Sequence, residues 1–478
     1  MTVTQEDMIT PDAPVTLENR LTPTVRDFLV TPRKMLIDGK WIDSASGKTF
    51  PVYDPATGNV ITQVAEGDTE DIERAVVAAR RAFESGPWSG MTPAERGRII
   101  WRIGDLILEN ADELAELESL DNGKPKKIAR VADIPLAADL FHYMAGWATK
   151  LLGNTIPFNS AYHTYTLREP VGVVGQIIPW NFPLLMAAWK LGPALTTGNC
   201  VILKPAEQTP LSALRLGELM QEAGLPDGVV NVVPGYGETA GAAIAAHDGV
   251  DKVAFTGSTE VGKLIVKAAA GNLKKVSLEL GGKSPNVLFK DAPDLDAAIA
   301  GAANAIFFNH GQTCCAGSRL YIEQDIYDRV LEGVSEHARN ITVGSGLNDA
   351  TDMGPLVSSE QLERVSGYLS SGLSEGATAV CGGQRIGNTG YFVEPTVLAD
   401  VRPDMKVVRE EIFGPVVVAE RFTDLDPVVP VANDTNYGLA AGIWTRDVSK
   451  AHQMARKLQA GTVWINCYNV FDPALRWV

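Results

Sequence analysis

The chain has 478 residues, of which 45% are hydrophobic and 21% are charged, and it carries a formal net charge of -16. This length exceeds what one hydrophobic core usually serves, so two large lobes with a small appendage are expected. The composition excludes extensive disorder. The negative charge repels nucleic acid and anionic membrane surfaces, which favours small molecules as partners.

No segment has the length and apolarity of a membrane span, because the longest apolar runs, such as VGVVGQIIPW and VVVAE, are short and interrupted. The first 20 residues are acidic and polar, so no secretory signal is predicted. Five cysteines form an odd set at low density, which is typical of a reducing compartment rather than of a disulfide framework. We therefore expect a cytoplasmic protein.

The first part of the chain combines turns, short strands and amphipathic helices. Residues 1–32 lack periodicity and contain four prolines, which predicts an extended arm over the surface. Residues 34–67 alternate short apolar runs with Asp-Gly, Ser-Gly and Thr-Gly turns, a pattern typical of small strands or hairpins. Two helical stretches follow, over 68–85 and 92–124, each opening with a capping residue.

From residue 171 the pattern changes to near-continuous Val, Ile and Leu runs that alternate with helical segments, as in VGVVGQII, NCVILKP, VVNVVPG and VDKVAFTG. Such alternation predicts an α/β fold with a parallel, doubly wound sheet, an architecture suited to a nucleotide. A second series of strands and helices starts near SPNVLFK. We place the boundary between the lobes at 279–282, where glycines separate the two series.

Two adjacent cysteines, Cys314 and Cys315, lie in FFNHGQTCCAGSR, a polar, glycine-flanked loop after an apolar helix. A cysteine sulfur is the strongest side-chain nucleophile near neutral pH, so this loop is a candidate catalytic site. Buried structural thiols are an equally good interpretation from the residues alone. Cys200 and Cys467 lie in apolar runs, so we expect small buried hydrophobic residues there.

Two polar residues elsewhere in the chain suit catalysis beside such a nucleophile. Glu279 lies between apolar residues ahead of two glycines, a setting that raises a carboxyl pKa and suits a general base. A helix cap or an ion pair is the alternative role. Asn181 follows a predicted strand, where its amide would stabilise an oxyanion unless it caps the next helix.

A cofactor site is predicted at the carboxyl ends of two further strands. Gly257 and Ser258 begin a helix whose amides would receive a phosphate, although GSTEVG lacks the second glycine of a G-x-G-x-x-G fingerprint. Lys204 and Glu207 follow the strand in VILKPAEQTP and would contact ribose hydroxyls, unless they are simply solvated. A carboxylate at the 2′-hydroxyl disfavours a 2′-phosphate, which favours NAD over NADP.

Taken in order, these segments resemble the NAD(P)-dependent aldehyde dehydrogenase superfamily over nearly the whole chain from about residue 33. The motifs that carry the resemblance are PWNFPL, LKPAEQTP, FTGSTEVG, LELGGKSP, FFNHGQTCCAGSR, EEIFGPV and WINCYN. The resemblance implies a Rossmann-type NAD-binding domain, an α/β catalytic domain and a small β hairpin for oligomerisation. On this chain the N-terminal arm would be 1–32 and the oligomerisation hairpin 150–168. The NAD-binding domain would comprise 33–149 and 169–278, and the catalytic domain 279–478.

The resemblance also assigns roles to individual residues. Cys314, two positions after Gln312, would be the nucleophile and Cys315 its non-catalytic neighbour. Asn181 and the backbone amide of Cys314 would form the oxyanion hole, and Glu279 would be the general base. No metal is expected. The implied cofactor is NAD, contacted by Trp180, Lys204, Glu207, Gly237, Gly257, Ser258, Gly262, Leu280, Glu411 and Phe413.

The substrate funnel implied by the resemblance is mostly aromatic, which predicts an apolar or aromatic aldehyde unless the rings are only core packing. Its residues are Phe182, Met186, Trp189, Phe308 and Phe471. The runs NVFDPAL and ADIPLAADLFHYMAGWA are most similar to phenylacetaldehyde dehydrogenases. A CoA-acylating dehydrogenase is the second interpretation, but those enzymes usually lack the base matched here by Glu279.

The C-terminus departs from the family pattern. After NVFDPAL the family usually continues with Pro-Phe-Gly-Gly, a helix and a terminal strand, whereas this chain reads Arg476-Trp477-Val478. The family is expected to form homodimers or homotetramers, and the terminal strand normally pairs with a partner subunit. We therefore expect weakened oligomerisation and an altered funnel wall, with a catalytically impaired or structural protein as the non-enzymatic alternative.

Overall fold

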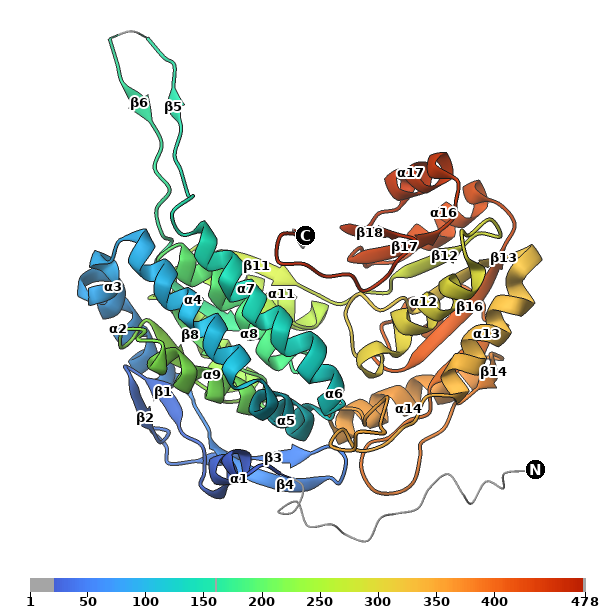
Figure 1. Ribbon diagram of the computed structural model, residues 1–478, viewed down its shortest axis with the longest axis horizontal. Coiled ribbons are helices and arrows are strands. Elements are labelled where there is room, and N and C mark those ends of the chain that lie inside the picture. The colour runs from blue at the N-terminus through green and yellow to red at the C-terminus, as the bar shows by residue number, and fades with distance from the viewer. Residues whose placement is uncertain (1–20, 160, 476–478) are drawn as a thin grey trace.

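The computed structural model describes residues 21–159 and 161–475, which form two lobes with one hairpin extending from the first (Figure 1). The predicted arm begins outside this part, but its described end forms helix α1 (Pro23–Val30). Val25 and Phe28 of this helix are buried. The prediction of an extended segment is therefore wrong there, because two apolar residues three positions apart bury one helical face.

The first lobe is built on a seven-stranded sheet with the order β11-β10-β7-β8-β9-β1-β2. The first five strands are parallel, and a hairpin of β1 and β2 extends the sheet in antiparallel fashion beside β9. In chain order the strands are β1 (Met35–Ile37), β2 (Lys40–Ile42), β7 (Val173–Ile177), β8 (Cys200–Lys204), β9 (Val230–Val232), β10 (Lys252–Thr256) and β11 (Lys275–Glu279).

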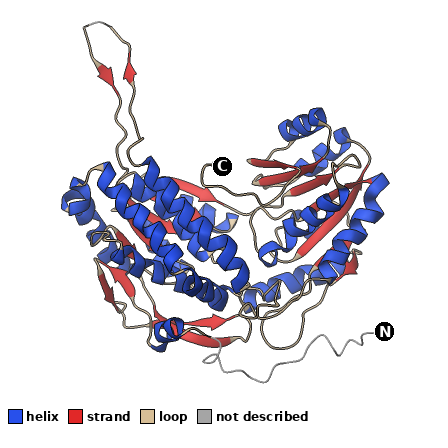
Figure 2. Cartoon of the chain, in the orientation of Figure 1, coloured by secondary structure: helices blue, strands red, loops and turns tan. Residues whose placement is uncertain are grey.

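Helices cover this sheet, and Figure 2 shows the long ones lying over it. The second predicted helix is divided at Asn110, whose φ of -108° and ψ of 23° interrupt it. The helical elements are α2 (Thr69–Ser85), α3 (Pro87–Gly90), α4 (Pro93–Glu109), α5 (Ala111–Asn122), α6 (Lys126–Ile128), the π-turn η3 (Ala129–Asp133), α7 (Ile134–Trp147), α8 (Pro183–Thr196), α9 (Leu211–Glu222), the π-turn η4 (Gly237–Gly241), α10 (Ala242–Ala246) and α11 (Thr259–Ala269).

The second lobe has its own seven-stranded sheet, ordered β14-β15-β16-β13-β12-β17-β18 and parallel except for β14. Its strands are β12 (Pro285–Leu288), β13 (Arg319–Glu323), β14 (Thr378–Cys381), β15 (Thr396–Ala399), β16 (Val416–Phe422), β17 (Ala440–Trp444) and β18 (Thr462–Ile465). Its helical elements are α12 (Leu295–Phe307), η5 (Phe308–Gly311), η6 (Gln324–Ile326), α13 (Tyr327–Arg339), α14 (Ser359–Ser374), α15 (Lys406–Arg409), α16 (Leu425–Asn433) and α17 (Val448–Lys457).

Two small antiparallel pairs complete the fold. Strands β3 (Thr49–Asp54) and β4 (Asn59–Ala65) pair with each other, as the turn signals predicted. Strands β5 (Thr155–Ile156) and β6 (Thr164–Tyr165) form the protruding hairpin seen in Figure 1. Among the described residues, no helix combines the length and apolarity needed to cross a bilayer. The expectation attached to Arg476-Trp477-Val478 lies outside the described residues.

Candidate active site

Parallel register brings the predicted site residues of the first lobe to one edge of its sheet. Ile177, the last residue of β7, pairs with Lys204 of β8 on one side and Phe255 of β10 on the other. Thr256 at the end of β10 pairs with Glu279 at the end of β11. Because the carboxyl ends of these four strands coincide, the loops that follow them meet at the edge where ligands bind in such sheets.

A cavity of about 660 Å³ is lined by the loops after β7, β10 and β11 and by loops of the second lobe. Its volume is in the range of small-molecule and cofactor sites. The aromatic side chains predicted for the funnel belong to its wall, as do the thiol, amide and carboxylate expected to do chemistry. The predicted residues that line it are Trp180, Asn181, Phe182, Met186, Trp189, Gly257, Ser258, Glu279, Leu280, Phe308, Cys314, Glu411, Phe413 and Phe471.

Four predicted cofactor residues lie outside this lining. The Lys204 ammonium forms an ion pair with Glu207, with 3.0 Å between Nζ and Oε2. Gly237 begins η4, whose last residue, Gly241, would bring an added Cβ within 3.9 Å of Lys204 Cδ. Gly262 lies inside α11, where a Cβ would meet Leu280 Cδ2 at 2.7 Å. Lys204 and Glu207 therefore form a neighbouring pair at the strand edge, and Gly262 allows close packing of α11.

The loop that carries the cysteines has unusual backbone geometry. Asn309, His310 and Gly311 have φ values of 49°, 60° and 67°, in the left-handed region that non-glycine residues rarely adopt. A Cβ at Gly311 would lie 2.0 Å from the carbonyl oxygen of Gly414, so only glycine fits. Burial lowers the pKa of His310 to about 3, so its neutral Nε2 accepts a hydrogen bond from the Gly354 amide at 3.0 Å.

The two adjacent thiols have different surroundings. Cys314 is partly exposed, whereas Cys315 is buried with 1% of its surface exposed. A hydrogen bond with Cys314, together with burial, raises the pKa of the Cys315 thiol well above its usual range. The Tyr468 hydroxyl donates to the Cys315 carbonyl at 2.7 Å. Cys315 is therefore a protonated, anchored neighbour, and the more exposed sulfur is that of Cys314.

Asn181 is tied to the cysteine loop across the two lobes. Its Nδ2 donates to the carbonyl of Gln312 at 2.9 Å, and Asn309 Nδ2 donates to the Asn181 carbonyl at 3.0 Å. An amide nitrogen has two hydrogens, so one is left for a ligand. The alternative role as a helix cap is wrong, because Phe182 occupies the N-cap position of α8 and makes no side-chain cap there.

Glu279 is the last residue of β11, which excludes a helix-capping role. Burial raises its pKa, and the cation of Lys190 partly opposes that rise. No ion pair to Glu279 within 4.0 Å occurs among the described residues, so the ion-pair alternative is wrong as well. Burial lowers the pKa of Lys190 to about 8, and the nearby Glu279 limits the decrease.

Lys190 was not predicted from the sequence, although it also lines the cavity. It lies on α8 four residues after Met186 and one after Trp189. Residues four apart share a helix face, so a lysine in register with a predicted funnel residue was a usable signal.

The loop before β16 is held by residues that the motifs did not reveal. Gln361 Nε2 donates to the Phe413 carbonyl at 2.7 Å, and Arg364 Nη2 donates to the Glu411 carbonyl at 2.6 Å. Glu411 Oε1 accepts from the Gly282 amide at 2.8 Å. Burial raises the pKa of Glu411, while this amide and the cations of Arg364 and Lys283 oppose the rise. This carboxylate thus contacts the glycine segment that joins the lobes.

The apolar part of the cavity is an aromatic wall. The rings of Phe182 and Phe308 are stacked with centroids 6.2 Å apart, and Met186, Trp189 and Phe471 line the same cavity. At another point Trp180 meets Phe413 edge to face, with 5.2 Å between centroids. Offset and edge-to-face contacts of this kind stabilise aromatic surfaces against each other.

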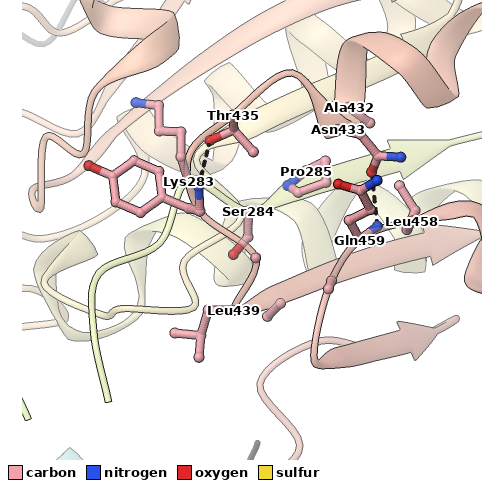
Figure 3. Close-up of a pocket in the computed structure, with 13 residues that line it drawn as sticks. Lys283, Ser284, Pro285, Ala432, Asn433, Thr435, Leu439, Leu458 and Gln459 are labelled. Atoms are coloured by element: carbon pink, nitrogen blue, oxygen red, sulfur yellow. Dashed lines mark hydrogen bonds between the residues drawn. The ribbon is translucent and has the colours of Figure 1, made fainter. Parts of the chain in front are cut away.

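A second hollow, in the second lobe, has a volume of only about 10 Å³. Figure 3 shows the segment Lys283–Pro285, which leads into β12, on one side of it and the Asn433–Gln459 contact on the other. The backbone N–H of Gln459 donates to Asn433 Oδ1 at 2.9 Å and closes that side of the hollow. This space suits a single water molecule, not a cofactor or an aldehyde.

A doubly wound parallel sheet that faces a second α/β lobe across a cavity is the architecture of a nucleotide-dependent enzyme. The chain belongs to the aldehyde dehydrogenase family, since the model of the Aldehyde dehydrogenase family matches residues 41–477. This confirms the resemblance and the predicted fold class, and it makes the protein an NAD-dependent oxidoreductase of that family.

Individual relatives agree with this assignment. The NAD+ complex structure of aldehyde dehydrogenase from Bacillus cereus superposes with a TM-score of 0.94 at 53% identity, covering 95% of this chain and 92% of that chain. Benzaldehyde dehydrogenase of Antirrhinum majus is 51% identical over 464 residues, or 97% of this chain and 86% of the relative. The structure of a cysteine-to-alanine mutant of an indole-3-acetaldehyde dehydrogenase from P. syringae, in complex with NAD+ and IAA, superposes with a TM-score of 0.92 at 46% identity, covering 94% of this chain and 91% of that chain.

The glycine pair at the lobe junction generates a first prediction. A Cβ at Gly282 would lie 2.1 Å from the Cys314 carbonyl oxygen, so Gly282→Ala must displace the cysteine loop. Because a misplacement of about 1 Å can cost about 100-fold in rate, we expect alkylation of Cys314 by iodoacetamide and aldehyde turnover to fall strongly. Gly367→Ala is the matched control, since nothing lies within 4 Å of its added Cβ. Equal rates in both variants would contradict the prediction.

Proposed function

We propose that the chain oxidises an apolar or aromatic aldehyde to the carboxylic acid with NAD+, through a thiohemiacetal and then a thioester on Cys314. The observation that carries the proposal is the shared lining of one cavity: Cys314, Asn181 and Glu279 face it together with an aromatic wall. A nucleophile, an oxyanion donor, a base and an apolar binding surface are the parts that such a reaction requires.

In the first half of the reaction the deprotonated Cys314 sulfur, a thiolate, attacks the aldehyde carbon; a carbon–sulfur bond forms while the carbonyl π bond breaks and its electron pair moves to the oxygen. The free hydrogen of Asn181 Nδ2 and the Cys314 backbone amide stabilise the resulting oxyanion; a donor of this kind is typically worth about 3 kcal/mol. Bound NAD+ supplies the hydride acceptor that converts the thiohemiacetal into a thioester. The carbonyl of Gln312 keeps Asn181 oriented toward the reacting atoms.

In the second half Glu279 accepts a proton from water, whose oxygen attacks the thioester carbon. The carbon–sulfur bond then breaks, and the carboxylic acid leaves as the Cys314 sulfur regains its starting state. The raised pKa of Glu279 suits a group that must take up and release a proton near neutral pH. The presence of this base supports hydrolysis over the alternative in which CoA resolves the thioester.

For the cofactor, the strand edge offers groups of the required chemistry. We assign Lys204 and Glu207 to the adenosine ribose, and the start of α11 at Gly257 and Ser258 to the pyrophosphate. Gly237, Gly262 and Leu280 shape the surrounding surface. We assign Glu411 to the nicotinamide ribose, and Phe413, braced against Trp180, to packing on the nicotinamide ring. A ribose carboxylate makes NAD the preferred cofactor over NADP.

For the substrate, the aromatic wall supports an arylaldehyde or arylacetaldehyde. The relatives named for benzaldehyde and indole-3-acetaldehyde are consistent with this class.

For assembly and location, we propose a cytoplasmic homo-oligomer. The hairpin β5–β6 exposes Ile156, Phe158, Tyr162 and Tyr165, apolar side chains that a partner subunit would cover. All five cysteines are free thiols, as suits a reducing compartment. The segments 33–149 and 169–278 form the cofactor domain and 279–478 the catalytic domain in this proposal, with 1–32 as the N-terminal arm and 150–168 as the oligomerisation hairpin.

An assay of NAD reduction over a panel of aldehydes tests the function. Phenylacetaldehyde and benzaldehyde should be oxidised with higher kcat/KM than glycolaldehyde or betaine aldehyde. Cys314→Ala should abolish turnover, whereas Cys315→Ala should retain it, because the Cys315 thiol is buried and protonated. The proposal fails if the unmodified chain oxidises none of the aldehydes, or if only Cys315→Ala is inactive.

The pH profile of kcat tests the role of Glu279. Its carboxylate must be ionised to accept a proton, so the rate should rise with pH through its pKa, which burial places above the usual range of glutamate. Lys190→Met removes the cation that opposes this shift, and the acidic limb should therefore move to higher pH. Lys275→Met, at the exposed start of the same strand, is the control and should leave the limb in place. A limb that moves equally in both variants would argue against Glu279.

Cofactor preference tests the assignment of Glu207. Removing the carboxylate in Glu207→Ser relieves repulsion of a 2′-phosphate, so the ratio of kcat/KM for NAD to that for NADP should fall by about tenfold or more. The Lys204 ammonium, freed from its ion pair, would then be available to the phosphate. Glu222→Ser, at the end of α9, serves as the control. An unchanged ratio in Glu207→Ser would place the ribose elsewhere.

A further inference from the structure

Helix α5 carries an unusual number of buried polar groups. Glu116, Glu118, Asp121 and Asn122 are fully buried, although burying a carboxylate is costly unless partners compensate. These side chains form hydrogen bonds with segments far away in the sequence, so α5 holds several of those segments in place. Lys124, two residues past the end of α5, is buried with 1% of its surface exposed.

The buried acids of α5 hold the beginnings of two helices, of which α8 lines the cavity. Glu118 Oε1 accepts from the Leu184 amide in the first turn of α8 at 2.9 Å. Asp121 Oδ2 accepts from the Leu211 amide at the start of α9 at 3.0 Å. Asn122 Nδ2 donates to the Trp180 carbonyl at 2.7 Å. Hydrogen bonds to α5 thus hold the chain on both sides of Asn181 and Phe182, at Trp180 and at Leu184.

Lys124 contacts both an acid of α5 and a residue of the segment that α5 holds. Its ammonium is hydrogen-bonded to Asp133, which is 3% exposed and lines the cavity. It lies 3.8 Å from Glu118 Oε2 and 4.4 Å from the centroid of the Phe182 ring. Phe182 in turn stacks on Phe308 in the aromatic wall. The buried cation of Lys124 therefore has three partners: Asp133, which lines the cavity, Glu118, which holds α8, and the ring of Phe182.

We propose that Lys124 is a positioning residue for the aldehyde site: its ammonium, paired with Asp133, fixes the Phe182 ring in the aromatic wall. The proposal rests on the proposed function for its kinetic consequence. Fold stability alone does not account for the charge, because apolar residues of similar volume usually replace a buried ion pair without loss of stability. A desolvated ammonium over a ring face, by contrast, is attracted to one ring orientation.

Fixing the Phe182 ring should affect the binding of the aldehyde more than the reacting groups. Lys124 touches the apolar wall and makes no described contact with Cys314 or Glu279. An aromatic aldehyde that packs on Phe182 should therefore lose affinity when the ring is released, whereas a small aliphatic aldehyde should not. This split in KM is not expected from a general loss of folding.

The experiment compares Lys124→Met, Asp133→Asn and the double variant Lys124→Met/Asp133→Asn in the full chain. In Lys124→Met we expect the KM for phenylacetaldehyde to rise about tenfold, with kcat and the KM for propanal changed by less than about twofold. The double variant removes the Lys124–Asp133 pair but leaves buried Glu118 without the cation 3.8 Å from its Oε2, so its Tm should recover only in part while the raised KM remains. If the single variant fails to fold, the double variant carries the same kinetic comparison.

Lys126→Met is the matched control. Lys126 also pairs with a buried acid of α5, with 2.9 Å between its Nζ and Glu116 Oε2, but among the described residues it has no ring contact like that of Lys124 with Phe182. Its loss should lower Tm and leave the KM for both aldehydes unchanged. Recovery of both Tm and KM in the double variant would overturn the proposal, because the charge would then serve folding only. So would equal changes in KM for the two aldehydes.

A readout independent of turnover separates this proposal from the proposed function. The chain is labelled with fluorophenylalanine, and Phe182→Leu identifies the 19F resonance of ring 182. We expect this resonance to shift and broaden in Lys124→Met and to stay in place in Lys126→Met. If the unmodified chain oxidises no aldehyde, the proposed function fails while the shifted resonance still supports ring positioning. An unchanged resonance in Lys124→Met overturns the positioning role whatever the activity.

Discussion

The coincidence of four strand ends is the constraint on which the site depends. Strands β7, β8, β10 and β11 are parallel and in register, so Ile177, Lys204, Thr256 and Glu279 end at the same edge. A polar residue in the middle of such a sheet would have to bury its side chain between apolar layers, whereas one at the last pair or just past it lies at the edge at a lower cost. Apolar runs within the strands and polar residues at or just after their ends are therefore two results of one geometry.

The second constraint is the close approach of the two lobes at the glycine pair. Added Cβ atoms at Gly281 and Gly282 would lie 2.2 Å from Glu411 Oε2 and 2.1 Å from the Cys314 carbonyl oxygen. The space that side chains would take is instead used by a hydrogen bond from the Gly282 amide to Glu411. Together with the bond from Asn181 to Gln312, this contact fixes the cysteine loop relative to the first sheet.

Much of this arrangement was predictable from sequence, because the strands are apolar runs and the functional residues follow them at turns. The lobe junction and the parallel sheets follow from such local patterns, whereas the lining of the cavity by Phe182 and Phe308 was implied only by the family resemblance. Other features depend on partners far away in the chain. Asn181 Nδ2 donates to the carbonyl of Gln312, 131 residues later, and Lys124 contacts the Phe182 ring only in the folded chain. Helix α1 was missed because its two buried residues are too few to create a periodic pattern.

The apolar character of the cavity also governs its ionisable groups. Burial in this cavity raises the pKa of Glu279 and lowers that of Lys190 to about 8, so each group is driven toward its neutral form. Their mutual attraction opposes both shifts, since each charge stabilises the other. A more polar wall would leave Glu279 ionised but a weaker base, and a wall without Lys190 would leave it protonated over a wider pH range. In the proposed reaction, substrate preference and proton transfer would therefore depend on the same low polarity, and a substitution that changes one should change the other.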